Sequence, residues 1–414
     1  MSNTFKVVDM VTREALRIAH ESCSFIGTID RQYDDSFKQT GAKNGDSLRV
    51  RLPNQYTRRS GSRVMDVQDQ AEATQTITVA TQDGVDMRFN SAELIQSVNS
   101  GSKFDDLSKN YIEPAVKSLV SAIESDVIAF ATKATYNVAG TAGTALTDLT
   151  VPGAARAKLN QSLAPKDGNR CIQADSVTMA SMVNGLKGLF QDSSQIKEQY
   201  REGMMGRTAM ADWYENERMW TLTNGTDVTA DTDAAALVTD GGTTIDFHTL
   251  LAVAQQKVGQ VFTIAGVYKC HPETKASLGV LQQFTITAIG ATTTTVSPAF
   301  NLTGAKKNVC SSTGADLATT DFDAKTLTFV GAASTSYVQN LMYHKEAYQF
   351  ITADLPIMDD AHKCVRRVQD GLSLRCWMAS DIRNDELLMR IDILYGMAAL
   401  RPEWGCRMIG SASA

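Results

Sequence analysis

An excess of basic charge is missing from this sequence. Among 414 residues, 40 lysines and arginines stand against 46 acids, so the formal net charge is −6. Dedicated DNA- and RNA-binding proteins usually carry a basic excess, and the charge balance therefore argues against that class. A long apolar run is missing too. The longest uncharged stretch, residues 276–305, is rich in threonine and is broken by Pro298, which argues against a membrane span.

Paired cysteines are also missing. The seven cysteines are scattered without a CxxC motif, and the first residues, MSNTFKVVDMVTREAL, are charged and lack the apolar region of a secretory signal. This pattern predicts reduced thiols in a cytoplasm and not a disulfide framework.

Motifs that carry chemistry are absent as well. The sequence has no Gly-Lys dipeptide for a P-loop, and it has no GxGxxG, HExxH or GxSxG pattern. No two of its five histidines lie within four residues of each other. We therefore expect no cofactor, no metal and no enzyme activity.

Two short stretches keep an enzyme alternative open. Cys270 and His271 precede Glu273, but adjacent residues on a strand point to opposite faces, so this thiol and imidazole do not act on each other easily. His362 and Cys364 are two apart, whereas a structural zinc site needs four ligands. A thiol- or metal-dependent enzyme that uses Cys270 or the pair His362 and Cys364 is the alternative hypothesis.

The apolar pattern predicts an α+β protein. At about 150 residues per domain, the length suggests two or three domains. Apolar residues spaced by three or four predict a helix that starts near Glu113 and runs to residue 134. Alternation in TITVATQDGVDMRFN predicts a hairpin over 76–90, with Gln82–Gly84 as its loop and Val79 opposite Met87. Residues 372–379 and 386–400 alternate and are expected to form a second hairpin.

Residues 222–332 differ in composition from their surroundings. They are rich in threonine, alanine, glycine and valine, with short alternating runs between turn signals. This composition predicts a small all-β barrel or sandwich inserted into the host domain.

A long polar segment follows the strand that ends at Pro53. Loops of this length inside compact domains are uncommon and usually serve function or interaction. Its charged residues are expected to pair with a neighbouring subunit. The candidate subunit-interface residues are Arg58, Arg59, Arg63, Asp66, Asp69 and Glu72.

The order of these elements resembles that of the major capsid (coat) proteins of tailed bacteriophages with the HK97-like fold. The resemblance is strongest to the short-tailed-phage branch, which carries an inserted β domain. It rests on TREALRIAHES, GDSLRVRLPNQY, TITVATQDGVDMRFNSAEL, PKDGNR, EQYREGMMGR, GQVFTIAGVYKCHPETK and RIDILYGMAALRPEWGCRMIG, in that order along the chain.

The resemblance implies a division of the chain. Residues 1–30 correspond to an N-arm helix. The peripheral domain comprises 31–135 and 371–414, including an extended loop at 53–75 and a spine helix at 113–134. The axial domain comprises 136–221 and 333–370, and the inserted β domain comprises 222–332.

The resemblance also implies a structural function without catalysis. Hexamers and pentamers are expected to form an icosahedral shell around double-stranded DNA, which the shell contacts non-specifically. A scaffolding protein and a portal are the expected partners during assembly in the host cytoplasm, and some relatives bind decoration proteins. The expected final location is the virion. Another structural virion protein, such as a tail protein, is a further alternative.

Overall fold

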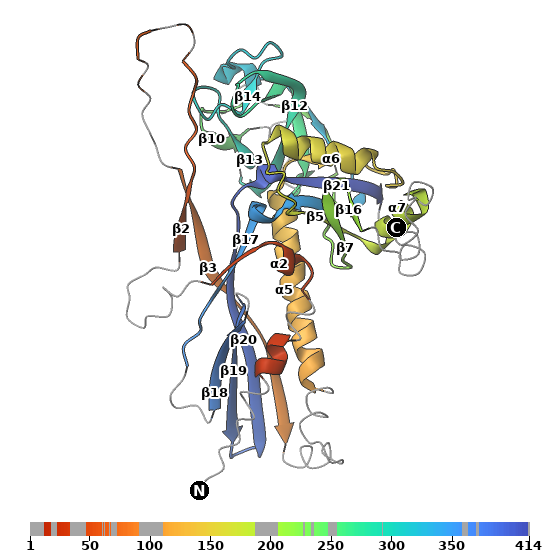
Figure 1. The fold of residues 1–414 in the computed structure, drawn as a ribbon, viewed down its shortest axis with the longest axis vertical. Coiled ribbons are helices and arrows are strands. Elements are labelled where there is room, and N and C mark those ends of the chain that lie inside the picture. The colour runs from red at the N-terminus through yellow and green to blue at the C-terminus, as the bar shows by residue number, and fades with distance from the viewer. Residues whose placement is uncertain are drawn as a thin grey trace. The chain divides into compact units, whose positions relative to one another are not determined.

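The computed structural model describes most of the chain, and Figure 1 shows its elements. The described residues are 12–17, 23–33, 47–59, 61, 63–65, 67, 73–90, 111–186, 206–226, 228–232, 236–246, 255–291, 293–357, 363–369 and 372–412. The chain divides into two compact units. One comprises Met1–Val50, Gln75–Val127 and Tyr348–Ala398, and the other comprises Arg51–Thr74, Ile128–Ala347 and Ala399–Ala414. None of the described helices is long and apolar enough to cross a membrane.

The first unit is built on a seven-stranded sheet. In spatial order, its main path is β1 (Asp30–Tyr33), β17 (Tyr348–Ala353), β20 (Glu386–Ala399), β19 (Leu372–Asp381) and β18 (Lys363–Gln369). β3 (Ala73–Asn90) pairs with β20 and with β2 (Ser47–Leu52). The second expected hairpin is present as β19 and β20, with Met378 opposite Met389. Opposite residues of paired strands point the same way, so the two strands share one buried apolar face, which includes Leu374, Cys376, Met389, Ile391 and Ile393.

The expected long helix is present as α5 (Glu113–Ala134). Pro114 lies in its first turn, where the missing N–H costs nothing, and Val116, Leu119 and Ile123 are buried along one side. Glu124 is also fully buried on this helix. Its carboxylate accepts hydrogen bonds from the backbone N–H of Phe25 (2.6 Å) and the hydroxyl of Ser24 (3.1 Å). Glu124 thereby holds the start of the short helix α2 (Phe25–Thr28).

The hairpin expected over 76–90 is wrong. Residues 73–90 form the single strand β3, which runs antiparallel to β20 with Met87 opposite Met389 and Val79 opposite Gly396. Gly84 makes no turn and lies opposite Asp392. The strand needs glycine at this position, because a Cβ there would meet Asp392 Oδ1 at 2.3 Å. Its neighbour Asp83 accepts a 2.7 Å hydrogen bond from the Tyr395 hydroxyl. The Asp-Gly pair therefore serves close strand packing and not chain reversal.

The second unit contains a mixed seven-stranded sheet. Its main path is β4 (Val138–Ala139), β21 (Gly405–Ala412), β16 (Ser336–His344), β5 (Arg170–Ala174), β7 (Ala211–Glu215) and β6 (Arg207–Thr208), and β8 (Thr221–Thr223) pairs with β16. The helix α6 (Thr150–Gln161) has Pro152 in its first turn. α7 (Ser176–Leu186) is preceded by Asp175, whose carboxylate accepts the N–H of Val177.

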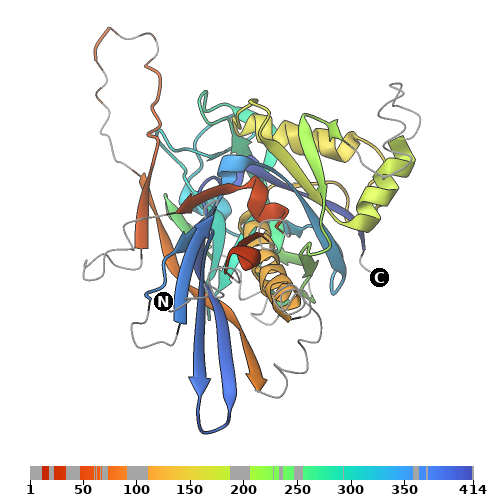
Figure 2. The same cartoon turned by 60° about the horizontal axis from the view of Figure 1, so that its bottom comes forward.

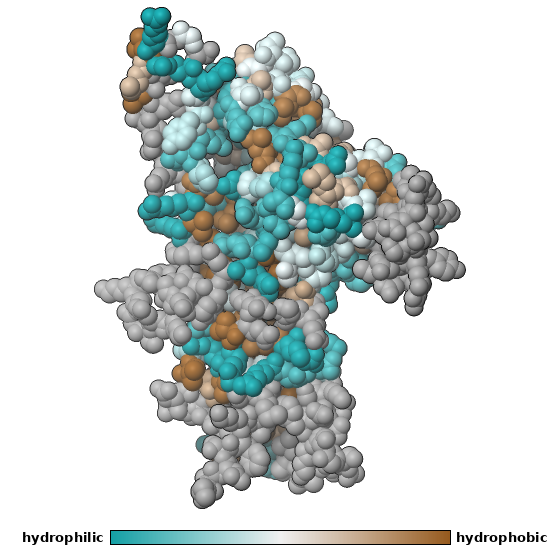
Figure 3. All heavy atoms as spheres, in the orientation of Figure 1, coloured by the Kyte–Doolittle hydropathy of each residue, from teal (hydrophilic) through white to brown (hydrophobic). Residues whose placement is uncertain are grey.

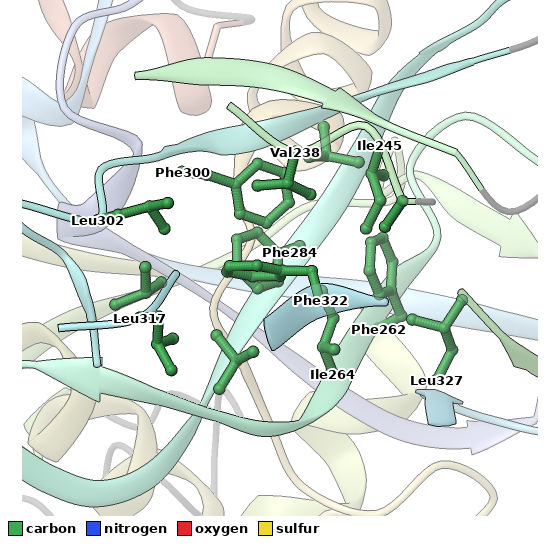
Figure 4. Close-up of a cluster of buried hydrophobic side chains, with 14 of the residues drawn as sticks. Val238, Ile245, Phe262, Ile264, Phe284, Phe300, Leu302, Leu317, Phe322 and Leu327 are labelled. Atoms are coloured by element: carbon green, nitrogen blue, oxygen red, sulfur yellow. The ribbon is translucent and has the colours of Figure 1, made fainter. Parts of the chain in front are cut away.

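The third sheet also belongs to the second unit and lies within the stretch predicted to be all-β. In order it comprises β10 (Gly242–Ile245), β13 (Thr294–Phe300), β12 (Ser277–Ile289), β11 (Val261–Cys270), β15 (Thr326–Phe329) and β9 (Thr229–Asp231), with β14 (Val309–Cys310) beside β11. Figure 4 shows a buried hydrophobic cluster among these strands. Phe284 lies at its centre, with ring centroids 5.8 Å from Phe262 and 4.8 Å from Phe300.

One arginine joins the third sheet to the rest of the second unit. Arg407 on β21 is fully buried. Its guanidinium donates to the carbonyls of Thr135 (2.7 Å), Gly259 (2.6 Å) and Lys133 (3.2 Å), and to the Thr285 hydroxyl (2.9 Å). The carbonyls of Lys133 and Thr135 belong to the end of α5, where helices leave carbonyls unpaired. Arg407 thus supplies hydrogen-bond donors both to the carbonyls at this helix end and to Thr285 of the third sheet.

The two units divide the chain differently from the expected domains. β17 and β18, which were expected in the axial part at 333–370, pair within the sheet of β19 and β20. β21, which was expected in the peripheral part at 371–414, pairs with β16 in the second unit. Strand pairing over long sequence distances sets these memberships, and composition carries no signal for it.

Candidate subunit interface

The candidate interface is the loop that connects β2 to β3. Figure 3 shows hydrophilic and hydrophobic side chains together on this loop, at the upper left. Arg58, Arg59 and Arg63 are all exposed. The three acids of the predicted set, Asp66, Asp69 and Glu72, lie outside the described residues. The structure therefore describes only the basic residues of this set, and the charge pairing with a neighbouring subunit stays a prediction.

The three arginines differ in what they contact. The Arg59 guanidinium donates to the backbone carbonyls of Val64 (2.5 Å) and Arg63 (3.5 Å), so it closes the loop onto itself. Within the described part of the chain, neither Arg58 nor Arg63 has a carboxylate at ion-pair distance. Arg59 shapes the loop, whereas Arg58 and Arg63 present charge outward.

Sequence reasoning missed the apolar part of this loop. Val64, Met65 and Val67 are each 77% exposed, and Tyr56 is 56% exposed. Single exposed apolar residues are ordinary, but a cluster on one loop is typical of an interaction surface. The signal was present in RVMDV (63–67), where apolar residues interrupt a polar segment.

Another exposed apolar side chain lies away from this loop, at the turn between β19 and β20, which form the blue hairpin in Figure 2. Ile382 is 97% exposed there. Asp381 fixes the turn, because its carboxylate accepts the N–H of Arg383 (2.9 Å) and the side-chain amide of Asn384 (2.8 Å). The turn therefore presents Ile382 on a fixed support.

The Cys270 segment is a strand end. β11 ends at Cys270, whose side chain is buried, and burial raises the pKa of its thiol to about 11. A buried thiol with a raised pKa is a poor nucleophile. His271 instead caps the following turn, since its Nδ1 accepts the N–H groups of Glu273 and Thr274, both at 3.2 Å. Cys270, His271 and Glu273 thus serve local structure.

The other alternative centres on His362 and Cys364. Cys364 is half-buried on β18, and His362 lies outside the described residues. In the described ranges, no three histidine, cysteine or acidic side chains come together as metal ligands would.

Comparison with known proteins identifies the family. Residues 110–410, well over half the chain, match the family model described as "P22 coat protein - gene protein 5". The chain therefore belongs to the P22 coat protein family. It is a tailed-phage major capsid protein, a structural component of the virion with the HK97-like fold, and it is not an enzyme.

Solved structures similar to this chain share little sequence with it. The structure of Mycobacterium phage Che8 is 11% identical and covers 92% of this chain and 89% of its own, with a TM-score of 0.46. One described as the capsid of an empty GTA particle is 10% identical and covers 94% and 90%, with a TM-score of 0.44. The capsid structure of Cyanophage P-SCSP1u is 10% identical and covers 89% and 84%, with a TM-score of 0.43. None of the curated proteins matches the chain.

Proposed function

We propose that this chain assembles into the hexamers and pentamers of an icosahedral shell, which encloses double-stranded DNA without reading its sequence. Assembly takes place in the host cytoplasm with a scaffolding protein and a portal. In this proposal residues 1–30 are the N-arm, α5 is the spine of the peripheral domain, the mixed sheet of β16 and β21 belongs to the axial domain, and the third sheet is the inserted domain.

The observation that carries the proposal is the composition of the loop at 53–75. Arg58 and Arg63 have no acid beside them in the described chain, and the nearby side chains of Val64, Met65 and Val67 are 77% exposed. Ordering such a segment costs conformational entropy, which contacts with another copy of the chain offset. We assign that role to an adjacent subunit.

The two kinds of side chain contribute differently to the contact. An exposed ion pair is worth about 0–1 kcal/mol, whereas full burial of a valine or methionine side chain is worth about 1.5–3 kcal/mol. The apolar residues therefore supply most of the binding free energy. The arginines, together with Asp66, Asp69 and Glu72, set the register between subunits through charge.

Assembly of the double variant Val64→Ser/Met65→Ser tests the apolar part. We expect it to remain a folded subunit, because neither side chain packs in a core, and to form few or no shells by light scattering and electron microscopy. Val280→Ser, which alters a 43% exposed valine in the third sheet, is the matched control and should assemble normally. Shells of normal size and yield from the double variant would refute this role.

Charge reversal tests the arginines. Arg58→Glu and Arg63→Glu should slow assembly most strongly at low salt, since salt screens exposed charges. Arg59→Glu should impair assembly by a different route, because it removes the hydrogen bonds to the Arg63 and Val64 carbonyls and loosens the loop. Lys257→Glu, at an exposed lysine elsewhere, is the control. Equal assembly rates for all four variants would eliminate the charge contribution.

A further inference from the structure

A cavity of about 410 Å³ lies within the second unit. Distant stretches of the chain line it, among them the start of the loop at Leu52 and Pro53, the end of β11 at Lys269 with the β13–β14 connection at Lys307, Ser162 just after α6, and the C-terminal segment around the short helix Pro402–Trp404. Its volume falls within the range of about 300–1,000 Å³ that is common for small-molecule sites. The cavity therefore has room for a ligand larger than a single water molecule.

Positive charge dominates its described lining. Lys269, Lys306, Lys307 and Arg401 contribute cations, and Glu403 contributes the carboxylate. Lys307 is already neutralised, because its ammonium lies 2.5 Å from Asp316. Three cations remain, and among the described residues none of them has a carboxylate within 4.0 Å.

These three cations have different settings. Lys306 is exposed at the cavity. The Arg401 guanidinium lies 4.2 Å from the centre of the Trp404 ring, which holds its flat fork in place. Lys269 is only partly exposed, and its ammonium donates to the Ser162 hydroxyl at 2.8 Å. An ammonium has three donors, and one acceptor in the described chain leaves two of them for a ligand or solvent.

Electrostatics support an anion at this position. Burial, with a smaller contribution from the nearby Lys158, lowers the pKa of Lys269 to about 8. Burial also raises the pKa of Glu403, so the carboxyl in the cavity is a weaker acid than a free one. The lining thus carries three unneutralised cations against the single carboxyl of Glu403, and an anionic ligand would offset the remaining positive charge.

We propose that this cavity binds a small oxyanion of the phosphate class, held by Lys269, Lys306 and Arg401. A guanidinium fork and two ammonium groups match the several oxygens of such an anion. Because Leu52, Pro53 and Gln55 form part of the lining, the bound anion braces the base of the loop against the third sheet. The phosphate group comes either from the free ion or from a mononucleotide.

Titration calorimetry on the unassembled full-length chain tests the proposal. Inorganic phosphate is one arm and adenosine monophosphate the other, both at constant ionic strength against chloride. We expect saturable binding at one site per chain in at least one arm, and the tighter arm identifies the source of the phosphate group. Lys306→Met and Lys269→Met should each weaken binding by about tenfold or more, as loss of a charged hydrogen bond predicts.

Lys257→Met is the matched control, since it removes an exposed lysine outside the cavity lining. It should leave the affinity unchanged. Lys306 is exposed, so its replacement should preserve the fold and gives a test that does not depend on any change in stability in Lys269→Met. Absence of saturable binding in both arms, or an equal loss of affinity in Lys257→Met, would overturn the proposal. The assay involves no assembly, so its outcome is independent of the loop's role between subunits.

Discussion

Replacement of Arg407 by methionine should destabilise the second unit more than most single substitutions. The change removes the four hydrogen bonds described above from a fully buried guanidinium while retaining much of the side chain's apolar length. A buried carbonyl that loses its donor costs about 1–3 kcal/mol. The carbonyls of Thr135 and Gly259 lose donors at 2.7 and 2.6 Å, whereas that of Lys133 keeps the Thr285 hydroxyl at 3.2 Å.

The expected loss in the free energy of unfolding is therefore about 3–5 kcal/mol, after partial compensation by apolar packing of the methionine. Natural domains have about 5–15 kcal/mol in total, so this is a large share. Urea unfolding of the unassembled chain, followed by tryptophan fluorescence, measures it. Trp220 is a suitable reporter, because its ring lies against Gly259.

Two controls sharpen this experiment. Arg407→Lys keeps the charge but loses the planar fork, so its stability should fall between those of the parent and Arg407→Met. Lys257→Met removes an exposed cation and should change little. If Arg407→Met unfolds within about 1 kcal/mol of the parent, the four contacts do not carry the junction, and the reasoning fails.

Three further predictions concern single side chains. Gly84→Val places a Cβ 2.3 Å from Asp392 Oδ1 and 2.9 Å from the Ile391 carbonyl, and should cost about 1–3 kcal/mol in urea unfolding, whereas Thr78→Ala on the same strand should not. Asp167 accepts hydrogen bonds from Asn169 and His344, which lower its pKa from 3.8 to about 2. The stability that its charged form contributes is therefore present above pH 4 and is lost as the pH falls toward 2. Asp167→Asn should remove this pH dependence of the free energy of unfolding. The lowered pKa of Lys269, about 8 against 10.5, means that protonation opposes folding, so Lys269→Met should be more stable than the parent at pH 7 in chloride buffer, with the difference shrinking as the pH rises from 8 to 10.5. An unchanged difference across that range would show that Lys269 titrates normally.

Local signals predicted α5 well. Pro114 can be placed only in a first turn, and the spacing of Val116, Leu119 and Ile123 marks one buried side. Both signals act within a few turns of the chain. The helix bounds could therefore be predicted without knowledge of what packs against it.

The strand at 73–90 could not be predicted correctly from local signals. Alternation with a central Asp-Gly pair fits a hairpin and an uninterrupted strand equally well. The choice depends on β20, which lies about 300 residues further along and extends the pairing past Gly84. A long-range partner thus overrode a local turn signal.

The candidate interface was only half predicted. The length and charge of the loop indicated an interaction element, yet the exposure of Val64, Met65 and Val67 needed the structure. The phosphate-class cavity could not be predicted at all. Its cations come from Lys269, Lys306 and Arg401, and no spacing rule joins residues so far apart in sequence.

The position of β18 has a consequence for unwanted association. In the described part of the chain this strand ends the main path of its sheet, and it carries Arg367 and Arg366, whose guanidinium lies 3.1 Å from the Asp354 carboxylate. An edge strand offers unpaired backbone groups to any similar edge, but charged side chains on it hinder the addition of another strand, because pairing would take their charge out of water. A coat protein meets many copies of itself while it accumulates. These two arginines raise the barrier to open-ended growth of β-structure, and so favour contacts that close into a finite particle over those that lead to fibres.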